Sequence, residues 1–234
     1  MVNTLIIGSS RGIGLCITKD LLKKGHIVKG ISRKEPLLTE KKNYSHINLD
    51  ISLTEKFSNY LKEININDFE NFIVCAGTND VAKLNQITNK RLLNLYKTNL
   101  FPSFELLKQI SQSHDNKPKS IVLFSSIWSS FGIAGRSMYG SSKAALVALA
   151  KHASSELSPY SIFVNCISPG FTNTELSNKT KKDPLISQAI KRSSNKSFQE
   201  TEAISNAILM LLNPNNKGIT GQEIFVDSGF SSHA

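Results

Sequence analysis

Residues 3–14 read NTLIIGSSRGIG, and this stretch decides the fold. The run from Asn3 to Ile7 is typical of a short buried strand, and the residues from Leu15 to Leu22 have helical periodicity. A glycine-rich turn thus connects a strand to a helix N-terminus, where free N–H groups and the helix dipole favour an anion. The stretch therefore predicts a nucleotide phosphate site. The residues expected to contact the nucleotide are Gly8, Ser10, Arg11, Gly12, Ile13 and Gly14.

The alternation of strand and helix continues along the chain. Further strands are expected at residues 26–31, 44–49, 72–74, 121–124, 162–167 and 223–226. Helical patterning covers residues 53–64, 88–113 with an interruption at Pro102, 139–150 and 202–212. Because strands and helices alternate, the sequence predicts a single α/β domain over residues 1–234. We expect a doubly wound parallel sheet of about seven strands with helices on both faces.

Ligands of such sheets bind beyond the carboxyl ends of the strands, and the residues found there suit a dinucleotide. No acidic residue stands directly after the second strand to bind ribose hydroxyls, whereas Arg33 and Arg11 supply positive charge for a 2′-phosphate. The pattern favours NADP(H) over NAD(H); a solvated basic turn is the alternative. Asp50 could accept from the adenine amino group, and the small Ala76 and Gly77 would let the nucleotide approach the backbone.

Tyr139 and Lys143 carry the predicted chemistry. They lie four residues apart in a helical stretch, so they share one helix face. An ammonium beside a phenol favours the phenolate, and Ser126 follows a neighbouring strand, from which its hydroxyl could bind the same substrate oxygen. The three side chains together would protonate a carbonyl oxygen. An ordinary exposed Tyr–Lys pair is the alternative.

Composition narrows the choice of function. The chain has 234 residues and 28 Lys+Arg against 18 Asp+Glu, a net charge of +10. Its basic residues are spread along the chain without aromatic interleaving, so we expect anionic small molecules or an acidic carrier protein as partners, and no nucleic acid. No apolar run approaches the ~20 residues of a membrane span, and the N-terminus lacks a signal peptide. We expect no membrane association, a cytoplasmic protein, and no metal site, because no cysteine or histidine has ligand spacing.

The chain contains, in order, the motifs Gly8-x-x-x-Gly12-x-Gly14, Asp50, Ala76-Gly77, Asn99, Ser126, Tyr139-x-x-x-Lys143, Pro169-Gly170 with Thr174, and Thr220-Gly221 with Asp227 and Gly229. In this order, the motifs resemble those of the short-chain dehydrogenase/reductase family over nearly the whole chain, closest to its 3-oxoacyl-acyl-carrier-protein reductase branch. The resemblance implies a single-domain Rossmann-type fold and an NADPH-dependent enzyme that reduces a ketone to a secondary alcohol. It also implies a homodimer or homotetramer.

The resemblance assigns a role to each catalytic residue. Tyr139 would donate the proton and Ser126 would bind the same oxygen. Lys143 would lower the pKa of Tyr139 and hold the nicotinamide ribose, and Asn99 would anchor a water of the proton relay. Thr174, after Pro169 and Gly170, would bind the cofactor's carboxamide.

Two departures from the family pattern stand out. Ile7 and Cys75 replace polar residues that support the cofactor loop, which suggests apolar contacts instead of polar ones. The basic residue that carrier-protein reductases often have just before the sixth strand is missing from residues 159–161, which weakens the acyl-carrier assignment.

Three functions lead at this point, and a nucleic-acid binder is the fourth and least favoured. The first is a ketone reductase that acts on a 3-oxoacyl thioester held by a carrier protein. The second reduces a sugar-derived or specialised-metabolite ketone. The third is a non-catalytic NADP-binding regulator, which would not need the proton relay. Residues 171–197, with six basic residues, are expected to form a loop that closes over an anionic substrate, or an ordinary solvated loop.

Overall fold

The computed structural model describes residues 1–39, 42–113, 115, 117–178 and 180–232. Its strands form one parallel seven-stranded sheet with the order β3-β2-β1-β4-β5-β6-β7. The strands are β1 (Asn3–Ile7), β2 (Ile27–Ser32), β3 (Tyr44–Asn48), β4 (Asn71–Val74), β5 (Lys119–Phe124), β6 (Ile162–Pro169) and β7 (Glu223–Val226). The predicted fold class is confirmed: the strand order reverses direction at β1, which is the switch point of a doubly wound sheet.

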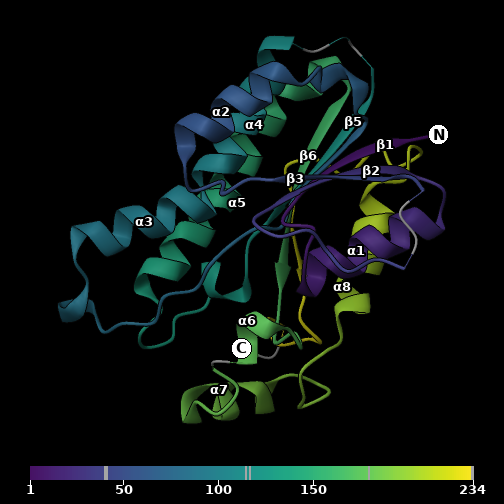
Figure 1. Ribbon diagram of the computed structural model, residues 1–234. Helices are drawn as coiled ribbons and strands as arrows, with labels where there is room; N and C mark the ends of the chain where they lie inside the picture. Colours follow the sequence, from purple (N-terminus) through teal and green to yellow (C-terminus); the bar gives the residue numbers. More distant parts are fainter. Residues whose placement is uncertain (40–41, 114, 116, 179, 233–234) are drawn as a thin grey trace.

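Helices cover both faces of the sheet (Figure 1). They are α1 (Gly12–Lys23), α2 (Thr54–Glu63), α3 (Asn89–Asn99), α4 (Phe101–Ser113), α5 (Ser137–Leu157), α6 (Glu175–Asn178), α7 (Pro184–Ala189) and α8 (Thr201–Leu211). On one face, α1 and α8 pack through Ile17 and Ile208 against Ile6 and other strand residues. On the other, α2, α4 and α5 bury Phe57 and further apolar side chains. Each face thus has its own hydrophobic core.

The elements differ from the predicted ranges in ways that have physical reasons. Helix α1 begins at Gly12, so two loop glycines belong to its first turn. The helical stretch at 88–113 is two helices that meet at Leu100, because Pro102 has no N–H to continue the ladder. Strand β6 runs to Pro169, whose missing donor is replaced by the neighbouring Gly170 N, 2.9 Å from the Val226 carbonyl oxygen.

Residues 171–197 contain two short helices that the sequence did not predict. Helices α6 and α7 form a small layer outside the sheet, next to the end of β6 (Figure 1). Beneath them, Phe171, Ile186, Ile190 and Phe230 form an apolar cluster of their own. The segment is therefore partly packed. Lys179, one of its six basic residues, lies outside the described residues.

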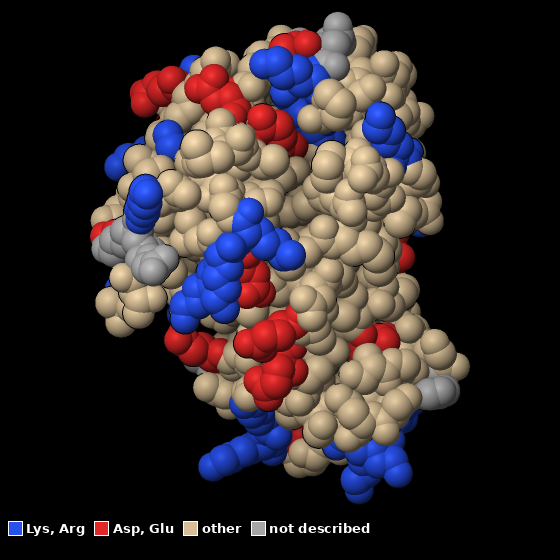
Figure 2. Space-filling model, turned by 90° about the vertical axis from the view of Figure 1, so that its right-hand side faces the viewer, with Lys and Arg blue, Asp and Glu red and all other residues tan. Residues whose placement is uncertain are grey.

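The surface in Figure 2 carries blue and red side chains interspersed over the same face. The excess of basic residues is thus spread on this side of the molecule and does not form one continuous field. Across the described part of the chain, no helix has both the length and the apolar character that crossing a membrane requires.

Candidate active site

The glycine-rich loop has no room for side chains at two positions. Gly8 has φ +100°, and a Cβ there would lie 2.6 Å from the Ala76 backbone nitrogen. A Cβ on Gly14 would lie 2.0 Å from the Gly8 carbonyl oxygen. The loop can therefore fold tightly against the end of β4 only with glycine at both sites, which leaves its backbone open to a ligand. This cradle above the start of α1 fits the phosphates of a dinucleotide.

Cys75 supports the same loop. Its Sγ lies 3.3 Å from the Ile7 carbonyl oxygen and 3.4 Å from that of Gly8, and the thiol donates to both. Burial raises the pKa of this thiol to about 12, so it stays a donor at neutral pH. The expectation of an apolar contact at Cys75 is therefore wrong, because a weak S–H donor replaces the polar group. Ile7 is fully buried in the core.

Ser126 and Tyr139 meet at the carboxyl end of the sheet. Ser126 precedes a 3₁₀ turn, η3 (Ile127–Ser129), and its hydroxyl accepts from Trp128 N at 3.3 Å. Tyr139 lies in the first turn of α5. Burial raises the pKa of Tyr139, whereas a hydrogen bond from Ser126 and the charge of Arg136 lower it. The effect of Ser126 on the Tyr139 pKa shows that the two side chains are neighbours, as binding of one carbonyl oxygen by both hydroxyls would require.

Lys143 is buried one turn further along α5. Its Nζ lies 2.7 Å from the Phe124 carbonyl oxygen, to which it donates, and 5.7 Å from the centre of the Tyr139 ring. Burial lowers the pKa of Lys143 to about 8. In this structure Arg136 is the cation that lowers the pKa of Tyr139, and the role expected for Lys143 stays a prediction.

Asn99, at the end of α3, is held from three sides. Its Oδ1 accepts from Thr78 N at 2.8 Å, and its Nδ2 donates to the Thr78 carbonyl and to Ser142 Oγ, each at 3.0 Å. A Cβ on Gly77 would lie 3.4 Å from Lys143 Nζ and 3.5 Å from Asn99 Oδ1. Asn99 therefore anchors the backbone that flanks Lys143. Its expected role as a water anchor stays a prediction.

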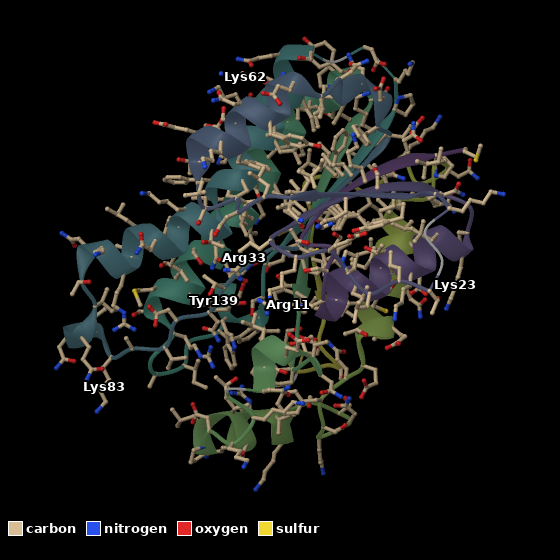
Figure 3. The ribbon with its side chains drawn as sticks, viewed as in Figure 1. Arg11, Lys23, Arg33, Lys62, Lys83 and Tyr139 are labelled. Atoms are coloured by element: carbon tan, nitrogen blue, oxygen red, sulfur yellow. The ribbon has the colours of Figure 1, made fainter. Side chains whose placement is uncertain are left out.

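The residues predicted to bind the adenosine lie in a more exposed part of the molecule. Asp50 accepts from the backbone N and the hydroxyl of Ser52 at 3.0 and 2.7 Å. Burial alone would raise the pKa of Asp50, but these bonds and the charge of Arg33 hold it below its usual value. Arg33 itself is exposed, and Arg11 forms an exposed ion pair with Glu175 of α6 at 3.5 Å. Figure 3 shows Arg11, Arg33 and Tyr139 near one another in that view, with Lys23, Lys62 and Lys83 at the periphery.

One cleft brings half of the expected residues together. The predicted residues that line it are Ile13, Gly77, Ser126, Tyr139, Lys143, Pro169, Gly170 and Thr174. Those outside its lining are Gly8, Ser10, Arg11, Gly12, Gly14, Arg33, Asp50, Ala76 and Asn99. Thr174 connects the two sets, because a Cβ on Gly12 would lie 3.4 Å from its methyl group. The loop and the hydroxyl pair thus belong to one continuous site.

Sequence reasoning missed several residues of this cleft. Trp128, Phe171 and Phe198 form an apolar wall, and Arg136 adds a second cation beside Lys143. Arg136 had a visible signal, since it precedes Tyr139 by one helical turn. The aromatic wall had none, because its members come from segments that only the fold brings together.

Comparison with known proteins agrees with these observations. The family model described as enoyl-(acyl carrier protein) reductase matches residues 7–231. Carbonyl reductase family member 4 of Xenopus laevis is 29% identical over 236 residues, which cover 97% of each chain. The 3-oxoacyl-acyl-carrier-protein reductase of Rickettsia bellii is 30% identical over 233 residues, 96% of this chain and 95% of the relative.

Solved structures share the fold. A 4-hydroxyisoleucine dehydrogenase complexed with NADH has a TM-score of 0.90 at 23% identity over 100% of both chains. The structure of ElxO with NADP bound has a TM-score of 0.87 at 24% identity over 99% of both. With the family match over nearly its full length and the relatives at 29 and 30% identity, the chain belongs to the short-chain dehydrogenase/reductase family of oxidoreductases.

Proposed function

We propose that this protein uses NADPH to reduce a ketone to a secondary alcohol. The observation that carries the proposal is the pair of Ser126 and Tyr139 hydroxyls, which share a cleft with the Lys143 ammonium beside the glycine-rich loop. The carbonyl reductase and 3-oxoacyl reductase relatives support a C=O substrate.

Each catalytic residue has its own role in the proposed reaction. When bound, NADPH would supply a hydride for the carbonyl carbon; with one proton for the ketone oxygen, an alcohol and the oxidised cofactor would result. Tyr139 donates that proton. Ser126 binds the same oxygen and stabilises the negative charge that develops on it. Lys143, a cation at neutral pH, favours the tyrosinate left behind.

Substrate and surroundings belong to the same proposal. A 3-oxoacyl thioester on a carrier protein is the first candidate, and a sugar-derived or specialised-metabolite ketone is the second. A non-catalytic NADP-binding regulator is disfavoured by the intact hydroxyl pair. The homodimer or homotetramer, the cytoplasmic location and the absence of nucleic-acid and membrane partners stay predictions.

The test is NADPH oxidation against a panel of ketones, oxo acids, oxo esters and 3-oxoacyl thioesters, with Tyr139→Phe as the diagnostic variant. We expect the variant to bind NADPH with nearly unchanged affinity, because it loses only one hydroxyl, and to lose more than 95% of turnover, roughly as expected for removing a general acid worth 10²- to 10⁴-fold. Turnover above that level would contradict the assignment of Tyr139. A wild-type protein that oxidises NADPH with no member of the panel would contradict the proposed function.

A further inference from the structure

The Arg136 guanidinium lies in the cleft of the candidate site, where no carboxylate of the described residues forms an ion pair with it. The residue is 5% exposed, and no described residue forms a hydrogen bond or an ion pair with its side chain. Burial lowers the pKa of this guanidinium, while Tyr139 and Asp183 raise it. Asp183 acts without forming an ion pair; its Oδ1 instead accepts from Leu185 N at 3.0 Å, at the start of α7. A charge this deeply buried is costly to leave unpaired.

The rest of the cleft supplies no counter-charge. Among the described residues that line it, none is Asp or Glu, and its charged side chains are Arg136 and Lys143. Lys143 already donates to the Phe124 carbonyl. The cleft also holds Asn79, whose buried Oδ1 has no partner, but an amide is neutral and cannot balance a guanidinium. Arg136 is therefore the group that a negatively charged ligand would meet.

The position of Arg136 relates that ligand charge to the reacting carbonyl. Arg136 is the N-cap of α5, three residues before Tyr139, and the two side chains are close enough for each to shift the other's pKa. It also lines a second hollow, formed mainly by residues 128–137. In a ligand whose anionic group binds Arg136, that group would therefore be only a few covalent bonds away from a carbonyl bound by Tyr139 and Ser126.

We propose that the substrate carries a free carboxylate that binds Arg136, so that the protein reduces an oxo acid. A planar guanidinium matches a carboxylate in a two-point hydrogen-bonded pair. The apolar wall of Trp128, Phe171 and Phe198 would contact the carbon skeleton of the same molecule. This inference rests on the proposed ketone reductase function and narrows its substrate class.

The test compares matched substrates on the full-length protein. Wild type, Arg136→Lys, Arg136→Gln and Asp183→Asn are assayed with 2-, 3- and 4-oxo acids, their methyl esters, and the phosphonate analogues of the acids. For the wild type we expect the best acid to exceed its ester by about 10²-fold in kcat/KM, as a charge-assisted bidentate pair would give. Arg136→Gln should bring that ratio to within a few-fold of one, mainly through KM, and Arg136→Lys should restore part of it.

Each outcome has a clear meaning. Esters reduced as well as acids by the wild type, or a phosphonate preferred over the carboxylate, would overturn the proposal while leaving the reductase function intact. The proposal would also be overturned if Asp183→Asn abolished the acid preference as Arg136→Gln does. The guanidinium would then act through its charge interaction with Asp183, which caps α7. A change in NADPH affinity on Arg136→Gln as large as the change in acid kcat/KM would place the residue at the cofactor, and would also overturn it. Failure of the proposed function itself would appear as no NADPH oxidation with acid, ester or neutral ketone.

Discussion

At the scale of single residues, Lys143 is a proposed catalytic residue whose charged ammonium group is buried. It is 4% exposed, and burial lowers its pKa from 10.5 to about 8. The unfolded chain therefore binds more protons than the folded chain between pH 8 and 10.5, and stability rises with pH through this window. Below pH 8 Lys143 is charged in both the folded and the unfolded chain, and the full free-energy cost of burying its charge reduces stability. At ~1.4 kcal/mol per pKa unit, this cost is about 3 kcal/mol.

We therefore expect Lys143→Met to stabilise the cofactor-free protein at pH 7. The gain should be about 2 kcal/mol, since loss of the bond to Phe124 offsets about 1 kcal/mol of the relieved penalty. The advantage should shrink as the pH rises from 8 to 10.5, because the wild type then loses its buried charge. Urea denaturation at both ends of this range measures it. Lys151→Met, at an exposed site on the same helix, is the control; a gain at Lys143 that does not depend on pH would disprove the argument.

We expect single residues to decide the choice of cofactor as well. Arg33 is exposed beyond β2, next to Ser32, whose hydroxyl donates to the Lys34 carbonyl at 2.8 Å. Charge-assisted bonds to a 2′-phosphate contribute roughly 1.5 to 3 kcal/mol each, so two arginines should favour NADPH by about 10²- to 10⁴-fold in kcat/KM. Because Arg11 pairs with Glu175 in this structure, we expect Arg33 to contribute the larger share.

The double variant Ser32→Asp with Arg33→Ala should erase or reverse this preference. Steady-state kinetics with both cofactors measures it, and Lys34→Ala serves as the control for loss of charge alone. A wild type that uses NADH as well as NADPH would show that Arg33 belongs to a solvated turn.

The residues of the candidate site were predictable to different degrees. Gly8, Tyr139 and Lys143 could be found from the sequence, because their spacing has a direct geometric meaning. The position of Arg136 just before Tyr139 was visible in the sequence, but its burial without an ion-pair partner among the described residues depends on the whole fold and could not be predicted. The prediction for Cys75 was wrong because its thiol donates hydrogen bonds to two backbone carbonyl groups, which only the folded loop brings close to it.

At the scale of elements, helix α5 is held against η3 by a close backbone contact. A Cβ on Gly140 would lie 2.6 Å from the Trp128 carbonyl oxygen. Gly140→Ala should gain up to about 1 kcal/mol of helix propensity, but the added methyl must push α5 away from η3. Because Ser126 stands directly before η3 and Tyr139 is on α5, the two hydroxyls would separate.

We expect Gly140→Ala to lower kcat by about 10- to 100-fold, the order expected for a misplacement near 1 Å. NADPH affinity should change little. Stopped-flow reduction and cofactor titration measure the two effects. Ser141→Ala, at an exposed site on the same turn, should keep wild-type kinetics; equal kinetics for both variants would mean that this contact does not position Tyr139.

The sequence predicted helices and strands correctly where their apolar residues form a clear run or period. Strands β1 and β7 each contain a short apolar run, and both were placed to the residue. Helices α6 and α7 were missed because they are too short to show a helical period and lie in a segment rich in basic residues. Ile186 of α7 packs in an apolar cluster that contains residues far away in the sequence, such as Phe230.

At the scale of the whole molecule, α3 and α4 present apolar side chains to solvent. Leu93 is 55% exposed, Phe101 37% and Phe104 52%. By family resemblance, helices of this region pair across two-fold axes, and such a pairing would cover these side chains. We expect light scattering at micromolar concentration to show a dimer or tetramer, and Phe104→Glu to shift it toward smaller species. Met210→Glu, at a 49% exposed site on α8, should not; a monomeric wild type would rule out this assembly.

The central position of β1 matters while the chain is being made. β1 pairs with β2 on one side and with β4 on the other, and Thr4 has Asn71 as its partner in β4, which is 67 residues later (71 − 4). At about 5 to 20 residues per second, ribosomes need roughly 3 to 13 seconds to synthesise that interval. Throughout that time the run from Leu5 to Ile7, which is fully buried in the folded protein, has at least one unpaired edge. The nascent chain therefore exposes an apolar strand early, and chaperone capture of the N-terminal segment would have its greatest effect before β4 emerges.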